Sequence, residues 1–301
     1  MKSKRQPPWT WSPEEIPDKG SSIAAGKNLN PDSWPNGKSV AVAFTFDVDA
    51  ETVWFDFNET SPSALSRGTF GVRRGMERIL NMLSTYELPA TFFVPAATLI
   101  LHPELATRLS ESPHEVGYHG YFHESPRRLN AEEERTVFLK GLEQFEKSLD
   151  RRPKGYRSPA FELSEETPGL LESEGFLYDS SLMADDRPYE LISPSLSRPL
   201  IELPVEWLLD DWAYFQAHWR ASHVALRNPT EVFEIFRQEF LCAHDEGTLF
   251  ILTLHPQVIG HRHRFRHLEN FVKTLKDDPS VWITTCQEIS EWIELQRTQN
   301  V

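Results

Sequence analysis

The sequence predicts an α/β domain whose strands form a parallel sheet, closed or nearly closed as a barrel. Two observations predict this class. From residue 39 onward, short apolar runs typical of strands alternate with segments of helical periodicity, and polar clusters stand where several of these runs end. Strand–helix alternation of this kind builds parallel sheets. Barrel domains commonly use about 250 residues or more, so a length of 301 residues requires no second domain.

The first predicted strand covers residues 39–46, "SVAVAFTF". Its continuous apolar run is typical of a strand that is buried on both faces. Later apolar runs predict further strands over residues 90–96, 154–161, 200–207, 248–254 and 280–285. The segments between them predict helices, of which the clearest lie around residues 76–83, 138–149 and 230–242.

Residues 1–37 are rich in proline, glycine, serine and tryptophan and show no periodicity, which predicts an irregular N-terminal arm. The barrel domain is predicted to occupy residues 38–301. Because large exposed apolar groups are unfavourable in water, we expect Trp9, Trp11 and Trp34 of the arm to cover apolar surface. The places expected for them are the mouth of the barrel and an interface with a neighbouring subunit.

Charge and composition exclude several classes of partner. The net charge of −14 argues against nucleic acid and against an anionic membrane surface. The first twenty residues contain basic side chains but no apolar stretch after them, so we expect no secretory signal. No segment has the roughly 20 apolar residues that span a bilayer. With only two cysteines, Cys242 and Cys286, the simplest expectation is a reducing, cytoplasmic location.

The stretch "FTFDVDAE", residues 44–51, ends the first predicted strand with acids. In an extended chain, residues two apart face the same way at a separation of about 6.6 Å. Asp47 and Asp49 can therefore look into one mouth, where one carboxylate binds a metal and the other accepts a proton from water. The alternatives for such a pair are a solvated strand end and a helix N-cap. For Glu51 a solvated loop position is favoured.

The stretch "HEVGYHGYFHE", residues 114–124, contains two histidines four residues apart. On a helix or in a tight turn, this spacing places His119 and His123 on one side, able to reach one ion. Two imidazoles and one carboxylate suit Zn²⁺ and tolerate Co²⁺, Ni²⁺ or Fe²⁺. The alternative is that both histidines are ordinary polar residues of a loop.

Two further stretches complete the set of candidate catalytic residues. In "GYRSPAFE", residues 155–162, Arg157 stands at the end of a predicted strand and can hold a carboxylate with its planar fork of donors. In "LTLHPQ", residues 252–257, His255 follows a fully apolar strand and is expected at the floor or rim of a pocket. The alternative for His255 is a core histidine bonded to a backbone carbonyl.

Taken in order, these stretches resemble the polysaccharide deacetylase (NodB-homology) family over residues 38–295. The motifs that carry the resemblance are "TFDVDAE", "HEVGYHGYFHE", "YRSPAFE", "ELPVEWLLDDW" and "LTLHP". The chain is most similar to the branch of peptidoglycan-deacetylase-like proteins that carry Asp-Val-Asp instead of adjacent aspartates. That branch includes cyclic imide hydrolases and lies near metal-independent allantoinases. The resemblance implies a distorted (β/α)7 barrel.

The resemblance also implies a role for each motif residue. The implied metal ligands are Asp49, His119 and His123, which would hold one divalent ion. We expect this ion to be Zn²⁺, with Co²⁺, Ni²⁺, Fe²⁺ or Mn²⁺ as alternatives. The implied catalytic residues are Asp47 as general base, Arg157 as the group that orients it, and His255 as general acid. Val48 between the two acids departs from the commonest family pattern.

A further set of residues is predicted to contact substrate. The candidates are Trp54, Glu162, Asp210, Asp211 and Trp212. Aromatic residues of 207–219 can wall a pocket that takes a sugar ring or a planar imide, although core packing is the alternative, and the acids can instead cap a turn. The charged segment 260–267, "GHRHRFRH", is expected to be a solvated loop or a helix start, or else an anion contact or a subunit seam.

The sequence thus predicts a metal-dependent hydrolase of non-peptide amide C–N bonds. Two substrate classes remain open: a small cyclic amide or imide, which is favoured, and an N-acetylated amino sugar of the peptidoglycan or chitooligosaccharide type. A binding protein that has lost the chemistry is disfavoured, because all six motif residues are present. We also expect a homo-oligomer, a dimer or a tetramer, with a partly lidded site.

Overall fold

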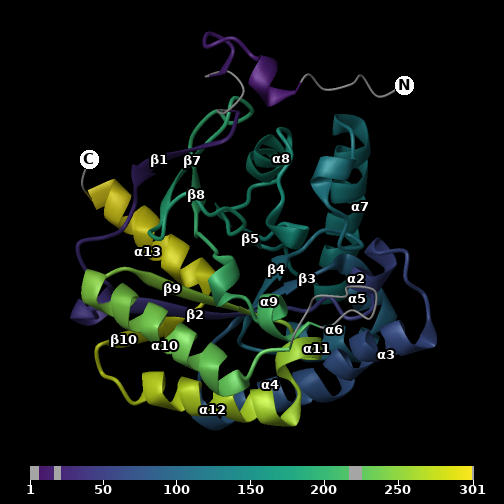
Figure 1. Ribbon diagram of the computed structural model, residues 1–301, viewed down its shortest axis with the longest axis vertical. Coiled ribbons are helices and arrows are strands. Elements are labelled where there is room, and N and C mark those ends of the chain that lie inside the picture. Colours follow the sequence, from purple (N-terminus) through teal and green to yellow (C-terminus); the bar gives the residue numbers. More distant parts are fainter. Residues whose placement is uncertain (1–6, 17–21, 217–225, 300–301) are drawn as a thin grey trace.

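Figure 1 shows a computed structural model of the chain, which describes residues 7–16, 22–216 and 226–299. Ten strands form one mixed sheet in the described residues. The strands are β1 Ala24–Asn28, β2 Val40–Asp47, β3 Thr91–Val94, β4 Glu115–Tyr118, β5 Gly155–Tyr156, β6 Tyr178–Asp179, β7 Tyr189–Ile192, β8 Leu200–Glu202, β9 Leu249–Leu254 and β10 Val281–Thr284.

Seven of these strands run parallel and side by side in the order β9-β2-β3-β4-β5-β6-β8. Beyond β8 the chain returns to the other end of the row, where a parallel bridge joins Asp210 to Thr253 of β9. The row therefore curls back toward itself, and the prediction of a distorted seven-stranded barrel is confirmed. Strand β10 lies outside this order and pairs with the first half of β2.

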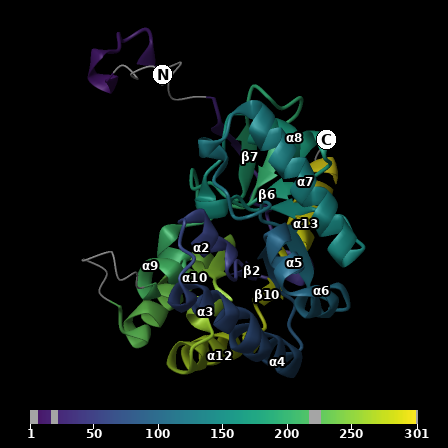
Figure 2. The ribbon, with the colours of Figure 1, turned by 90° about the vertical axis from the view of Figure 1, so that its right-hand side faces the viewer.

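Helices cover the outside of the sheet, as Figures 1 and 2 show. Helices α10 and α12 pack against β9 and β10, and α7 contacts α5 and α6. The helices are α2 Thr52–Asp56, α3 Pro62–Phe70, α4 Met76–Tyr86, α5 Ala96–Leu101, α6 Pro103–Ser110, α7 Ala131–Leu149, α8 Thr167–Ser173, α9 Asp211–Phe215, α10 Pro229–Glu246, α11 Pro256–Ile259, α12 Arg262–Lys276 and α13 Cys286–Gln299. The predicted helices correspond to α4, α7 and α10.

Strand β2 is the centre of the core. Every one of its residues is buried, because β9 pairs along one side while β3 and β10 share the other. Phe44 and Phe46 enter the main hydrophobic core, where Phe46 stacks on Phe92 with ring centroids 5.2 Å apart. A strand buried on both faces reads as a continuous apolar run, and this explains why the first strand was the clearest signal in the sequence.

Two predicted strands are shorter than expected. The strand predicted over 154–161 ends at Tyr156 and is followed by a 3-10 turn, Pro159–Phe161. The strand predicted over 200–207 ends at Glu202, two residues before Pro204. Proline has no N–H to donate to a neighbouring strand, so both prolines stop the regular pairing. Strands β4, β6 and β7 were not predicted.

The arm is less irregular than predicted, because β1 pairs antiparallel with β7. Trp34 is buried, packs on Trp282 with ring centroids 6.0 Å apart, and donates its indole N–H to the carbonyl of Gly247. Gly247 precedes β9, so Trp34 lies at the opposite end of the sheet from the mouth. Trp34 therefore covers apolar surface, as predicted, but it does not lie at the mouth, which was one of the two places expected for the arm tryptophans; Trp9 is 85% exposed.

Two smaller observations bear on the sequence analysis. Within the described residues, no helix combines the length and apolar character needed to cross a bilayer. Cys242 is exposed and Cys286 is buried, and both are free thiols.

Candidate active site

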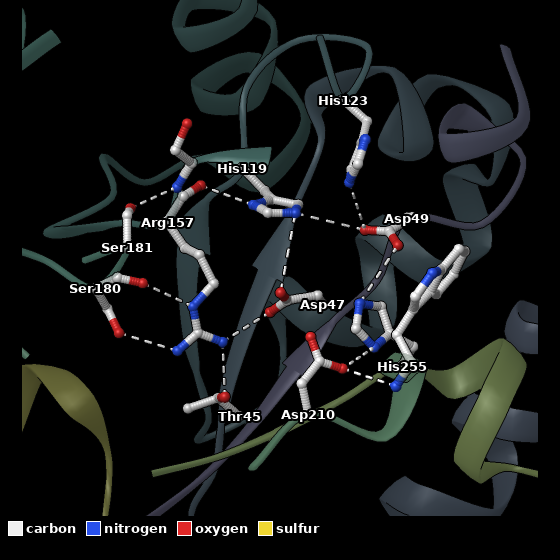
Figure 3. A network of polar contacts seen from close by, with 12 residues as sticks. Thr45, Asp47, Asp49, His119, His123, Arg157, Ser180, Ser181, Asp210 and His255 are labelled. Atoms are coloured by element: carbon white, nitrogen blue, oxygen red, sulfur yellow. Dashed lines mark hydrogen bonds and ion pairs between the residues drawn. The ribbon is translucent and has the colours of Figure 1, made fainter. Parts of the chain in front are cut away.

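The six motif side chains converge at the carboxyl ends of the parallel strands, as Figure 3 shows. Asp47 is the last residue of β2, and Asp49 follows in the next loop. His119, Arg157 and His255 each follow directly after their strands, β4, β5 and β9. Loops at this edge of a barrel converge, which is why residues far apart in sequence meet here. His123 joins them from the loop after His119.

Asp47 and Asp49 face the same side because the chain stays extended through Val48. The backbone N–H of Val48 donates to the carbonyl of Phe93 in β3, and the Val48 side chain is buried in the core. Asp47 and Asp49 therefore point to the other side, into the mouth. The predicted arrangement of the two acids is confirmed.

His119 and His123 lie in a tight turn after β4, not on a helix. The turn needs positive φ at Gly120 and at His123, and the Glu124 carboxylate accepts N–H bonds from Tyr121 and Phe122 within it. The Nε2 atom of His119 lies 3.5 Å from Asp49 Oδ1, and that of His123 lies 3.9 Å from the same oxygen. The sequence left a helix and a tight turn open for the segment that carries His119 and His123, and the structure shows the turn.

The donor atoms of Asp49, His119 and His123 fit a divalent metal ion. One ligand atom of each lies within 4.8 Å of the others, and all three residues are buried. Tetrahedral zinc ligands at bond lengths of about 2.0–2.1 Å stand about 3.3 Å apart, close to the separations given above. Among the described residues, the buried Oδ1 atom of Asp49 has no hydrogen-bond partner. Its lone pairs are therefore available to a metal ion.

The protonation states of these groups also suit metal binding. Burial lowers the pKa of His119 to about 4 and that of His123 well below its usual value. Both imidazoles are therefore neutral at pH 7, the form that binds metals. Burial raises the pKa of Asp49 to about 7, with the nearby Asp47 carboxylate adding to the rise. A cation placed beside Asp49 would favour its ionised form.

Neighbouring groups fix the orientation of these ligands. His119 Nδ1 lies 2.7 Å from the carbonyl of Arg157, to which it donates, so the lone pair is on Nε2 facing Asp49. Gln257 donates from Nε2 to Asp49 Oδ2 at 3.1 Å. The role of Gln257 was not predicted, although it stands two residues after His255 in a motif that the sequence analysis quoted.

Arg157 is buried against Asp47. Its Nη1 donates to Asp47 Oδ1 at 2.9 Å and to Thr45 Oγ1 at 2.7 Å. Its other donors reach Ser180, with Nε 3.0 Å from the carbonyl oxygen and Nη2 2.9 Å from the hydroxyl. The guanidinium is thus fixed on several sides, and Asp47 is oriented as the sequence analysis predicted.

His255 forms a pair with Asp211. Its Nδ1 donates to Asp211 Oδ1 at 2.7 Å, which leaves Nε2 facing the cavity, 3.9 Å from Asp49 Oδ2. Burial lowers the pKa of His255, but Asp210, Asp211 and Asp49 together outweigh burial and raise it well above its usual value. The imidazole therefore carries a proton on Nε2 that it can donate.

The other predicted substrate contacts are distributed differently. Asp210 and Trp212 line the cavity above the metal-binding residues. Trp54 is buried behind Trp212 and does not line the cavity. Glu162 points to the surface, where it pairs with Arg127 at 2.9 Å. The Asp211 carboxylate bonds to His255, so it is a partner of that histidine and not a substrate contact.

Several remaining predictions are also answered. Glu51 is not solvated: it is buried, accepts a hydrogen bond from Thr69 and lies 2.6 Å from His102 Nε2. The segment 260–267 contains the start of α12, as one of the expectations held. The aromatic segment 207–219 forms a 3-10 turn and α9, but its last three residues, 217–219, lie outside the described residues.

Comparisons with known proteins agree with this geometry. The crystal structure of a Mycobacterium smegmatis protein assigned as a polysaccharide deacetylase superposes with a TM-score of 0.83 at 36% sequence identity, over 90% of this chain and 96% of that one. The chain belongs to the polysaccharide deacetylase family. Residues 36–178 also match the family profile described as polysaccharide deacetylase.

Two other proteins extend the comparison. A peptidoglycan deacetylase of Helicobacter pylori is 29% identical over 281 residues, which cover 84% of this chain and 96% of that protein. The crystal structure of Puue allantoinase has a TM-score of 0.74 at 23% identity, over 87% of this chain and 93% of that one. This second likeness shows a shared fold. Family membership makes the chain a hydrolase that acts on C–N bonds other than peptide bonds.

Proposed function

We propose that this protein is a zinc-dependent amide hydrolase whose preferred substrate is a small cyclic amide or imide. One observation carries the proposal: the Asp47 carboxylate, the candidate metal ligands Asp49, His119 and His123, and the His255 imidazole all line a single small cavity. Zn²⁺ is proposed because two neutral imidazoles and one carboxylate are ligands that it favours.

The reaction divides between the two sides of the cavity. Asp49, His119 and His123 would hold a divalent ion, and such an ion would supply a Lewis acid at this site. Asp47 accepts the proton of the attacking water, while its hydrogen bond from Arg157 keeps the carboxylate oriented.

His255 completes the reaction at the leaving group. An amide nitrogen leaves poorly unless it is protonated as the C–N bond breaks. The Nε2 proton of His255 faces the cavity, and Asp211 holds the ring from the other side through Nδ1. His255 therefore donates to the leaving nitrogen, and Asp211 positions the imidazole and stabilises its charge.

The size and walls of the cavity favour a small ring. Its volume is about 80 Å³, far below the roughly 300–1,000 Å³ of pockets that enclose drug-sized ligands. Its apolar walls are largely aromatic: Phe57, Phe161, Trp207 and Trp212. Flat aromatic walls above a polar floor suit a planar amide or imide ring, whose carbonyl would face the metal ligands.

A second candidate function is N-deacetylation of an N-acetylated amino sugar. The similarity to the Helicobacter pylori peptidoglycan deacetylase favours it. So do two rim residues, Phe57 at 51% and Trp207 at 43% exposure, because sugar rings stack on exposed aromatic faces. In this case only the acetamido group would enter the cavity.

The two candidates can be separated by direct assay. Zinc-loaded protein is incubated with succinimide, with phthalimide and with an N-acetylglucosamine oligomer, and ring opening or acetate release is measured. The Asp47→Asn variant controls for contaminating enzymes. We expect turnover of an imide and little release of acetate. Acetate release without imide turnover would overturn the preferred substrate, and no turnover of any of the three compounds would contradict both candidates.

A further inference from the structure

Two buried acids that the proposed mechanism does not use lie behind Arg157. Asp179 ends β6 and Glu202 ends β8, and the two residues are partners in the parallel pairing of these strands. Both are fully buried. Two adjacent buried carboxylates could not both be ionised without a large cost in free energy.

The hydrogen bonds of the pair account for one oxygen of each acid. Asp179 Oδ1 accepts from the Ser181 hydroxyl at 2.7 Å. Glu202 Oε1 accepts from the backbone N–H groups of Ser181 and Leu182 at 2.8 and 2.9 Å. The remaining oxygens, Asp179 Oδ2 and Glu202 Oε2, are buried and receive no donor from the described part of the protein.

The two carboxyl groups are nevertheless close neighbours, because both accept hydrogen bonds from Ser181, one from its hydroxyl and one from its backbone N–H. Two carboxylate oxygens can hydrogen-bond only if one of them carries a proton. Burial raises the pKa of Asp179 to about 6, and burial together with the Asp179 charge raises that of Glu202 well above its usual value. Both shifts favour a proton held by the pair at neutral pH.

The pair is connected to the active site through residues 180–182. The same short segment that bonds to Glu202 and Asp179 presents the Ser180 carbonyl and hydroxyl to Arg157 (Figure 3). Ser181 Oγ also accepts the backbone N–H of Ser158, next to Arg157. The other charged or titratable groups that face the pair are Arg157, Tyr156 on β5 and Tyr189 on β7.

We propose that Asp179 and Glu202 share a single proton and act together as positioning residues, which fix the segment 180–182 and thereby hold Arg157 against Asp47. The neutral member costs little to bury, and the charged member remains available to the Ser181 hydroxyl. The catalytic part of this inference rests on the proposed role of Asp47, whereas the shared proton can be tested without any turnover.

The proton content is tested by the pH dependence of stability in the wild type and in Glu202→Gln. An acid whose pKa is raised by folding makes the folded state bind more protons, so stability falls as pH rises above the usual pKa of 4.5. The amide side chain of the variant cannot lose a proton. The folding equilibrium constant of Glu202→Gln relative to wild type should therefore rise by up to about tenfold per pH unit above pH 4.5.

Two measurements accompany the titration. Tyr189→Phe is the matched control, because Tyr189 faces the pair but the change removes no carboxyl group. The folding equilibrium constant of Tyr189→Phe relative to wild type should not change with pH. Infrared difference spectra of wild type minus Glu202→Gln at pH 7 should show the C=O band of a protonated carboxyl group. A pH-independent ratio for Glu202→Gln, or no such band, would overturn the shared proton.

The positioning role is tested by kcat and KM of metal-loaded variants. Glu202→Gln can donate to Asp179 as the protonated acid does, so it should keep kcat within about threefold, while Glu202→Ala should lose at least about tenfold in kcat with a smaller change in KM. Bound metal should stay at the wild-type level in both.

If Glu202→Ala does not fold, the test rests on Glu202→Gln, which should fold and keep kcat because its amide can still donate to Asp179. A loss in Glu202→Gln as large as in Glu202→Ala would overturn the positioning role. Absence of turnover in the wild type would instead contradict the proposed function and leave the proton measurement as the test of the pair.

Discussion

At the scale of single residues, one buried valine separates two acids with different surroundings. Asp47 is held by Arg157, and Asp49 faces His119 and His123 with one oxygen that no described donor satisfies. An arginine that donates at 2.9 Å fixes the orientation of the Asp47 carboxylate, as a general base requires. An oxygen without a donor beside two neutral imidazoles is the environment of a metal ligand. The surroundings therefore support the division of roles that family resemblance implied.

This division predicts different outcomes for the two asparagine variants. Asp47→Asn should bind metal as the wild type does but lose at least about 10²-fold in kcat, the usual scale for a general base. Asp49→Asn should lose the metal itself. Metal content per chain and steady-state kinetics measure the two properties separately. If Asp47→Asn emptied the site while Asp49→Asn retained the ion, the two roles would have to be exchanged.

At the scale of elements, the sequence predicted what single strands determine and missed what pairing determines. The apolar run of β2 and the spacing of Asp47 and Asp49 are local properties, so both were predictable. Strand β6, which was not predicted, has two residues and exists only through its neighbours. The bond between Gln257 and Asp49 and the shared burial of Asp179 and Glu202 likewise join distant segments, and only the fold brings them together.

The loop that carries Asp49 is positioned by helix α3. Gly68 of α3 packs so closely on this loop that a Cβ atom there would lie 2.5 Å from the carbonyl carbon and oxygen of Ala50. Ala50 itself has a positive φ of 52°, an uncommon conformation for alanine that its neighbours must maintain. The helix and the loop therefore cannot move apart or together without displacing Asp49.

Gly68→Ala should accordingly weaken metal binding as well as the fold. Overpacking costs roughly 1–3 kcal/mol, which exceeds the gain of up to about 1 kcal/mol from replacing a helical glycine by alanine. Ser63→Ala, on an exposed part of the same helix, is the matched control and should change neither property. Thermal unfolding and zinc titration measure both, and a Gly68→Ala protein with unchanged zinc affinity would show that α3 does not position Asp49.

At the scale of the whole molecule, the arm has two different parts. Residues 24–28 join the sheet through β7, and Trp34 closes the far end of the core. Trp9 remains 85% exposed in the described structure, so it covers no apolar surface of its own chain there. The arm does not close the mouth through Trp34, so the small size of the cavity comes from the barrel loops themselves.

We therefore expect the first part of the arm to mediate self-association. The full chain should behave as a dimer or tetramer in size-exclusion chromatography with light scattering, and a variant that lacks residues 1–16 should be a monomer with unchanged hydrolysis. The Trp9→Ala variant should shift the equilibrium in the same direction. A monomeric full-length protein would contradict this expectation without affecting the proposed chemistry.

The central claim is that one divalent ion, held by Asp49, His119 and His123, is required for C–N bond hydrolysis. The most direct measurement is a zinc titration of the chelated protein in which bound metal and hydrolysis are followed together. Hydrolysis should be absent at the start, rise in proportion to bound zinc and level off at one equivalent per chain, while His123→Ala should not acquire that equivalent. Full activity after exhaustive chelation, with no metal retained, would contradict the claim.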